Sequence, residues 1–139
     1  MRTDDRGETL LELLVAVVVM GIAVVAIVGG LATSILVSDY HRKQSTAGEY
    51  VRDYAEVAES LPYKPCALPA DYAGFTAPSG FTATPTAIRY WNAGAWSGTC
   101  ASPDSGLQQL AIQVASADGR ATERVTVVLR KACGPGSSC

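Results

Sequence analysis

The stretch that decides the fold is residues 13–37, LLVAVVVMGIAVVAIVGGLATSILV, which contains no charged residue. A helix rises about 1.5 Å per residue, so a run of this length crosses a hydrocarbon core of about 30 Å. A cleaved secretory signal is the competing interpretation, but its apolar region usually spans only about 7–15 residues. A small-x-small cleavage site at Ala32 and Ser34 is approximate at best. The sequence therefore predicts a membrane-spanning helix near the N-terminus.

The residues just before this run are GETLLE, at positions 7–12. Glu12 places a carboxylate at the start of an otherwise apolar helix. Near mid-membrane such a group costs about 2.5–3.5 kcal/mol, and less where it reaches the interface. Alone, Glu12 would be interpreted as an interfacial residue with no special role.

The whole hexapeptide, followed by a full-length apolar helix, resembles the processing motif of the type IV prepilin-like and pseudopilin family. In that family a membrane peptidase cleaves after the Gly and methylates the new amino terminus. The resemblance implies a cut between Gly7 and Glu8, which leaves residues 1–7 as a leader peptide. It also implies that Glu12 attracts the free amino terminus of a neighbouring subunit during assembly. Such a pairing is physically sensible, because a carboxylate and an amine each lower the other's burial cost.

The first mature residue departs from the family pattern. Family members usually have Phe, or sometimes Met or Leu, where this chain has Glu8. Glu8 and Glu12 are four residues apart, so on a helix they share a face and repel. The departure bears on methylation and filament packing more than on cleavage. It favours a minor subunit over a major pilin, since minor subunits tolerate other residues here.

Three glycines, Gly21, Gly29 and Gly30, interrupt the apolar run. Many family members carry a Gly and a Pro in this helix, where it loosens in the filament, and here the Gly pair replaces the Pro. Gly costs about 1 kcal/mol relative to Ala in a helix interior, so the pair predicts a weak point. Alternatively, Ala26, Gly30 and Ser34 form a small-residue stripe for close packing. Both interpretations imply contact between helices.

Beyond the membrane, apolar residues recur at spacings of three and four, which predicts a continuing one-sided helix: Ala47, Val51, Tyr54, Ala58 and Leu61. Pro62 and Pro65 are expected to end it. We therefore expect one helix from about Thr9 to Ser60, comprising a transmembrane and assembly part (8–37) and an amphipathic stem (38–61).

The remainder, residues 62–139, is predicted to form a β-rich head outside the cytoplasm. Residues 63–85 have no clear period and are expected to be a surface loop. Short strands are predicted at 87–91 and 95–100, around a turn at Asn92-Ala93-Gly94. A clearer hairpin is predicted from 107–114 and 122–129, around a turn that contains Gly119. The expected fold class is α+β, with a long N-terminal helix packed on a small antiparallel sheet, as in pilins.

All four cysteines, Cys66, Cys100, Cys133 and Cys139, follow the apolar run. An even count in a small head favours disulfides and an oxidising compartment. Three pairings are possible, of which we favour Cys66–Cys100 and Cys133–Cys139. A four-thiolate zinc site is the alternative, but its usual paired spacing is missing, so no metal is expected. Because Lys and Arg flank the apolar run equally, the cysteines decide the orientation, with the head outside.

Other function classes find little support in the composition. The net charge is −2 with mixed signs, so no direct binding of nucleic acid is expected. His41, the only histidine, falls beside the membrane, which leaves no Ser/His/Asp set in the head, and neither an enzyme nor a cofactor is expected. The aromatic residues Tyr72, Tyr90, Trp91 and Trp96 either pack within the head or form an adhesive surface.

The sequence thus indicates a structural subunit, a minor pilin or pseudopilin of a type IV pilus or a related type II secretion or DNA-uptake filament. Its expected partners are the prepilin peptidase, other pilin subunits, an inner-membrane assembly platform and membrane lipid. It is expected in the cell membrane as a single-pass protein and then in a filament on the surface or across the periplasm. The alternatives are a major pilin and a single-pass envelope protein with a ligand-binding head.

Overall fold

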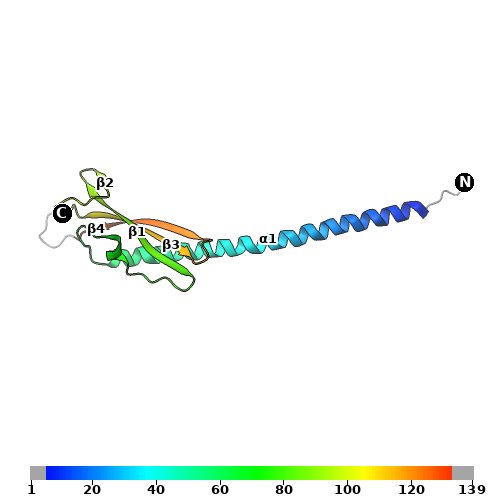
Figure 1. The fold of residues 1–139 in the computed structure, drawn as a ribbon, viewed down its shortest axis with the longest axis horizontal. Coiled ribbons are helices and arrows are strands. Elements are labelled where there is room, and N and C mark those ends of the chain that lie inside the picture. The colour runs from blue at the N-terminus through cyan, green and yellow to red at the C-terminus, as the bar shows by residue number, and fades with distance from the viewer. Residues whose placement is uncertain (1–5, 133–139) are drawn as a thin grey trace. The chain divides into compact units, whose positions relative to one another are not determined.

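The computed structural model describes residues 6–132 of the chain, with side chains from residue 10 onward. The chain divides into two compact units, Met1–Asp39 and Tyr40–Cys139, which are described separately. The elements in order are α1 (Arg6–Ser60), the 3₁₀ helix η1 (Pro69–Tyr72), β1 (Phe81–Asn92), β2 (Ala95–Ser97), β3 (Leu107–Ser116) and β4 (Thr122–Arg130) (Figure 1). This is the predicted α+β architecture, a long helix with a small antiparallel sheet.

Helix α1 ends where the sequence predicts. Ser60 is its last residue, and the Ser60 hydroxyl donates to the carbonyl of Val57 at 2.7 Å. Pro62 follows two residues later and disfavours a helical conformation in the residue before it. At the other end, α1 begins at Arg6, three residues before the expected start at Thr9.

The sheet has the strand order β2-β1-β3-β4, and every neighbouring pair is antiparallel. The predicted hairpin is confirmed as β3 and β4, with Gly119 at a φ of +70° in the connecting turn. The predicted turn between β1 and β2 is also present. Its two central residues, Ala93 and Gly94, both have positive φ, as a tight two-residue hairpin requires.

Strand β1 is longer than the sequence predicts. It begins at Phe81, so the expected loop over residues 63–85 is wrong for residues 81–85, and the loop itself contains η1. The reason is the one-sided pairing of this part of β1. Strand β2 pairs only with residues 90–92, so Pro85 lies where no second neighbour needs its missing N–H. A register shift between Pro85 and Ala87 also breaks the alternation that would have marked the strand. Strand β2, in turn, stops at Ser97 rather than Cys100.

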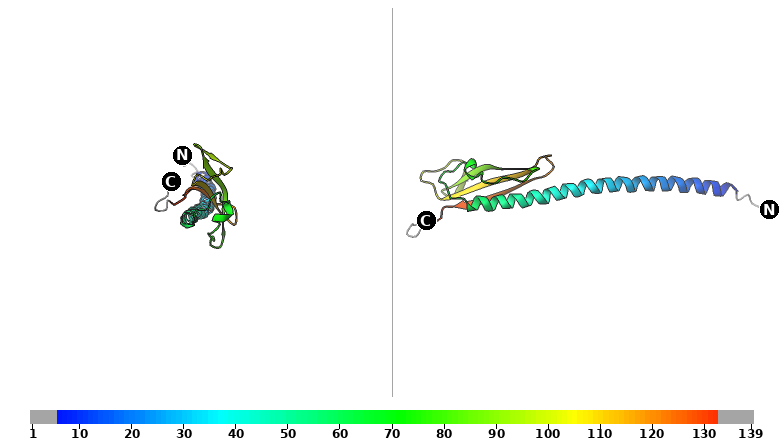
Figure 2. Two further views of the ribbon diagram at one scale, coloured as in Figure 1. Left: turned by 90° about the vertical axis from the view of Figure 1, so that its left-hand side faces the viewer. Right: turned by 90° about the horizontal axis from the view of Figure 1, so that it is seen from below.

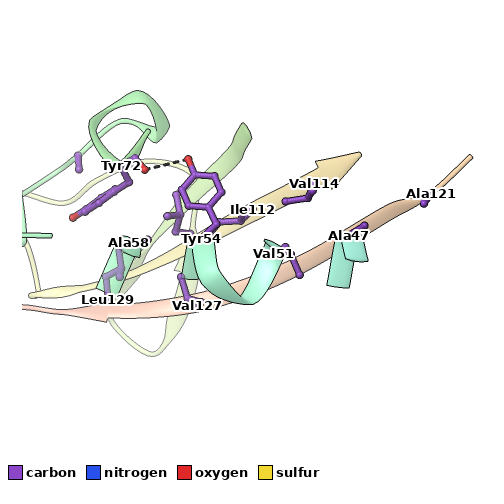
Figure 3. Packing of buried hydrophobic residues seen from close by; sticks show 12 residues of the cluster. Ala47, Val51, Tyr54, Ala58, Tyr72, Ile112, Val114, Ala121, Val127 and Leu129 are labelled. Carbon is purple, nitrogen blue, oxygen red and sulfur yellow. Dashed lines mark hydrogen bonds between the residues drawn. The ribbon is translucent and has the colours of Figure 1, made fainter. Parts of the chain in front are cut away.

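The core of the second unit lies between α1 and the sheet, which the helix follows along one face (Figures 2 and 3). Helix α1 contributes Ala47, Val51, Tyr54 and Ala58, as predicted, and the sheet contributes Leu110, Ile112, Val114, Val127 and Leu129. Two of the four helix residues are alanines, whose small side chains let the helix approach the strands. Burying each larger apolar side chain stabilises the head by about 1.5–3 kcal/mol.

Buried polar groups attach the loop after α1 to this core. The Tyr54 hydroxyl donates to the carbonyl of Tyr72 at 3.1 Å, and the Tyr90 hydroxyl donates to the carbonyl of Ala67 at 2.7 Å. The Gln108 side chain is fully buried and donates to the carbonyl of Lys64 at 2.8 Å. Tyr72 and Tyr90 therefore pack inside the head, so the predicted alternative of an adhesive surface does not apply to them.

Candidate functional site

The first unit presents an apolar surface that no other described residue covers. Between residues 10 and 37 every described side chain is exposed, including those of the large apolar residues Leu10, Met20 and Leu31. Contiguous apolar surface of this size is typical of a membrane or partner contact. By length and composition, this is the one helix among the described residues that could cross a membrane. A cleaved signal sequence meets the same criterion, so the residues before the span carry the distinction.

The predicted processing and assembly residues lie in the first turns of α1. The backbone of Gly7 and Glu8 is helical, and Glu12 follows one turn later with an exposed side chain. Glu12 makes no ion pair with any side chain of residues 10–132. Its carboxylate therefore stands at the start of an apolar surface with its charge uncompensated by described residues. A partner amine from another chain would lower the cost of keeping it there.

The three glycines of the span lie within a continuous helix. A Cβ added at Gly21, Gly29 or Gly30 would meet no atom within 4 Å, so packing within the chain does not require glycine there. The Thr33 hydroxyl donates to the carbonyl of Gly29 at 3.1 Å. Such bonds to the residue four positions earlier slightly destabilise and often bend helices. The glycines remain available for either predicted role, a weak point or a contact with another helix.

A disulfide joins Cys66 and Cys100, with a Cα–Cα distance of 5.5 Å across 34 positions of sequence. This is one of the two pairings that the sequence favours. It connects the loop after α1 to the segment after β2. The other two predicted disulfide residues, Cys133 and Cys139, lie outside the described residues.

Asp104 collects four hydrogen-bond donors beside this disulfide. It accepts from the backbone N–H groups of Cys66 and Gly106, both at 2.8 Å. The Tyr63 hydroxyl donates at 2.8 Å and the Gln108 amide at 3.2 Å. Burial alone would raise the pKa of the Asp104 carboxyl, but these donors together outweigh it and leave the pKa below its ordinary value. Two of these donors, Cys66 and Tyr63, lie 38 and 41 positions from Asp104 in the chain, so local sequence does not reveal the cluster.

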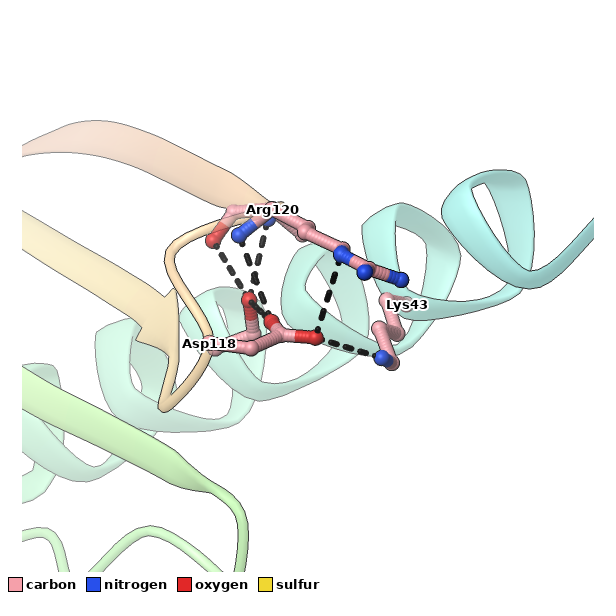
Figure 4. Close-up of polar contacts among 5 residues, drawn as sticks. Lys43, Asp118 and Arg120 are labelled. Atoms are coloured by element: carbon pink, nitrogen blue, oxygen red, sulfur yellow. Dashed lines mark hydrogen bonds and ion pairs between the residues drawn. The ribbon is translucent and has the colours of Figure 1, made fainter. Parts of the chain in front are cut away.

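A second polar cluster connects the β3–β4 turn to α1 (Figure 4). The ammonium group of Lys43 lies 2.6 Å from the Asp118 carboxylate, which also accepts from the Ser116 hydroxyl at 2.7 Å. Arg120 lies at 3.7 Å from the same carboxylate. The bond from Lys43, followed by those from Ser116 and the Arg120 N–H, holds the pKa of Asp118 well below its usual range. The ion pair between Lys43 and Asp118 thus links the β3–β4 turn to α1 near the start of the second unit.

Comparison with protein families finds the prokaryotic N-terminal methylation motif over residues 2–28. That motif is the type IV prepilin-like signature, and it covers the junction of Gly7 and Glu8, Glu12 and the first half of the apolar run. Neither the curated proteins nor the solved structures yield a match to the chain.

The signature supports a place for the chain in the family of type IV pilins and pseudopilins, whose members are structural subunits. It implies processing by a prepilin peptidase and assembly with other pilin subunits. The single apolar N-terminal helix fits a membrane-anchored member of this kind.

Proposed function

We propose that the chain is a minor pilin or pseudopilin, a structural subunit of a type IV pilus or a related type II secretion or DNA-uptake filament. Prepilin peptidase cleaves it between Gly7 and Glu8 and removes residues 1–7 as a leader. The observation that carries the proposal is the methylation motif over residues 2–28, which includes the start of an exposed apolar helix. An ordinary membrane anchor needs the helix but not the motif.

Assembly rests on a charge pair in this proposal. Cleavage creates an ammonium group at Glu8, and the Glu12 carboxylate of a neighbouring subunit attracts it as residues 8–37 move from lipid into the filament. Both charges are costly in an apolar surrounding and compensate each other when paired. The inner-membrane assembly platform acts on the same segment, and Gly21, Gly29 and Gly30 supply its close packing or local flexibility.

The minor role is favoured by Glu8. A first mature residue with a negative charge four positions from Glu12 weakens the pairing in a filament built from identical copies. A subunit present in few copies, next to subunits with an uncharged first residue, avoids most of this repulsion. The head, residues 62–139, faces away from the cytoplasm, and the Cys66–Cys100 disulfide supports this orientation because such bonds persist in oxidising compartments.

The decisive experiment is the identity of the mature N-terminus. The full chain is expressed with its cognate prepilin peptidase, and the terminus is determined by mass spectrometry. A terminus at Glu8 is expected, and it should disappear in a peptidase-null strain and in Gly7→Ala. Gly21→Ala, the same substitution inside the span, should be processed normally. An intact Met1 terminus, or a cut near Ala32, would contradict the proposal.

Abundance separates a minor from a major subunit. In sheared filaments, quantitative mass spectrometry should find this chain at a small fraction of the principal subunit. If it makes up most of the filament mass, the minor assignment is wrong while the pilin assignment stands.

A further inference from the structure

The sheet has a second face, opposite α1, that the assembly role does not use. Along β3 the buried residues Leu110, Ile112 and Val114 face the helix, so the alternating residues Gln109, Ala111 and Gln113 face away. The strand register places their partners on the same outer face. We call this the outer face, and its members are Thr82, Thr84, Ala87, Arg89 and Trp91 on β1, Trp96 on β2, Leu107, Gln109, Ala111, Gln113 and Ala115 on β3, and Thr122, Arg124, Thr126, Val128 and Arg130 on β4.

The outer face is positively charged although the chain as a whole carries a net charge of −2. Its charged residues are Arg89, Arg124 and Arg130, all exposed, and it contains no Asp or Glu. Within residues 10–132, none of the three arginines forms an ion pair. Four carboxylates, those of Glu49, Asp53, Glu56 and Glu123, line a groove along the stem helix instead. Glu59 of the same helix lines a hollow with Arg130 and Val128 at the β4 edge, outside the list of outer-face residues.

Small side chains leave a hollow in the middle of this positive face. The hollow has a volume of about 220 Å³ and is lined by Ala87, Arg89, Gln109, Ala111 and Thr126. An arginine fork, an amide and a hydroxyl thus surround a space that a polar ligand can enter. Towards one edge, the Arg124 Nε–H donates to the Gln113 amide oxygen at 2.7 Å, which orders that guanidinium before any ligand binds.

An aromatic pair borders the same face. Trp91 and Trp96 lie opposite each other on β1 and β2, with ring centroids 5.3 Å apart in an edge-on arrangement. Both side chains are only partly buried. They present apolar ring surface two residues from Arg89, so a ligand that spans both must combine negative charge with apolar patches.

We propose that the outer face binds an acidic polysaccharide. Arginine forks pair with carboxylates in a bidentate manner, amide and hydroxyl side chains match sugar hydroxyls, and tryptophan rings pack on the C–H faces of sugars. The spacing of the charges separates this ligand from nucleic acid. Arg89 and Arg130 lie two strands apart across the sheet and two residues apart along it, which places their Cα atoms about 12 Å from each other. Along one strand of duplex DNA the phosphates repeat about every 3.4 Å, so about three to four phosphates would lie across the distance between these two arginines and exceed the positive charges that face them.

The test uses the full chain, unassembled in a neutral detergent, so its outcome does not depend on filament formation or on N-terminal processing. The probe is polygalacturonate, with neutral dextran and a 20-base-pair DNA duplex for comparison at equal ionic strength. Trp91 and Trp96 are the only tryptophans in the chain, so intrinsic fluorescence reports directly on this face. Polygalacturonate should change the emission, with an affinity that falls as salt rises.

Charge-matched variants locate the binding. Arg89→Gln/Arg130→Gln should weaken polygalacturonate binding at least tenfold. Arg42→Gln/Arg52→Gln, which removes two exposed arginines from the stem helix, should leave it within about twofold. Because all four side chains are exposed, the thermal unfolding of both variants should match that of the unaltered chain. The proposal is overturned if the stem variant weakens binding as much as the sheet variant, if dextran binds equally well, or if the duplex binds more tightly.

Discussion

Removing the Cys66–Cys100 disulfide should destabilise the head by an amount that follows from the length of the loop it closes. The bond spans 34 positions of sequence. In the chain-entropy description, a crosslink of this length lowers the conformational entropy of the unfolded chain and so stabilises the folded head by about 4 kcal/mol at 25 °C. The folded head keeps its other ties, since Asp104 still bonds to the Cys66 N–H and Tyr90 still bonds to the Ala67 carbonyl. The variant Cys66→Ser/Cys100→Ser should therefore fold, with its free energy of unfolding lowered by about 3–4 kcal/mol.

Urea unfolding of the full chain in detergent, followed by tryptophan fluorescence, measures this loss. Both tryptophans lie inside the crosslinked loop, so they report on its unfolding. The slope of free energy against urea should also rise, because an uncrosslinked unfolded chain exposes more surface. Cys133→Ser/Cys139→Ser is the matched control. In the same description a Cys133–Cys139 bond closes a much shorter loop and contributes about 2 kcal/mol, so this variant should lose clearly less stability than the first. A loss below about 1 kcal/mol for the first variant, or equal losses for the two, would refute the chain-entropy reasoning.

Three further predictions concern the core, a carboxylate and the assembly residue. Ile112→Ala should cost about 2–5 kcal/mol of unfolding free energy, because Ile112 is fully buried against α1. Val128→Ala on the outer face should cost no more than about 1 kcal/mol. Equal losses would contradict the placement of the core. The pKa of Asp104 lies below its ordinary value, so the stability that Asp104 contributes is present above its unfolded pKa and is lost as pH falls through its folded pKa. Asp104→Asn should flatten this acid dependence in urea unfolding measured from pH 6 to 2. An unchanged profile would contradict the proposed hydrogen bonds of Asp104. Glu12→Gln should leave cleavage at Gly7 intact but lower incorporation into filaments about tenfold, as expected for the loss of a charged hydrogen bond of about 1.5–3 kcal/mol; normal incorporation in sheared filaments would remove Glu12 from the assembly mechanism.

The candidate assembly segment could be predicted almost entirely from sequence. A helix in an apolar medium satisfies its own backbone groups, so an uncharged run of sufficient length predicts both its conformation and its surroundings. The motif around Gly7 and Glu12 is local in the same sense, and the family comparison found it over residues 2–28. The stem stripe and the β3–β4 hairpin were likewise evident, because their periods of 3.6 and 2 follow directly from helix and strand geometry.

Only the tertiary structure determines the features that residues far apart in the chain form together. Asp104 appears in the sequence as one more loop carboxylate, yet it gathers donors from Tyr63, Cys66 and Gln108 because the sheet and the disulfide bring those segments together. The full length of β1 depends on the short β2, which pairs only with residues 90–92 and so leaves room for Pro85 within the strand. The positive outer face exists only because strand register aligns Arg89, Arg124 and Arg130 from two strands. The periodicity of a sequence shows which face of a helix or strand is buried. It does not show which distant residues meet, because strand register and the path of the loops determine those contacts.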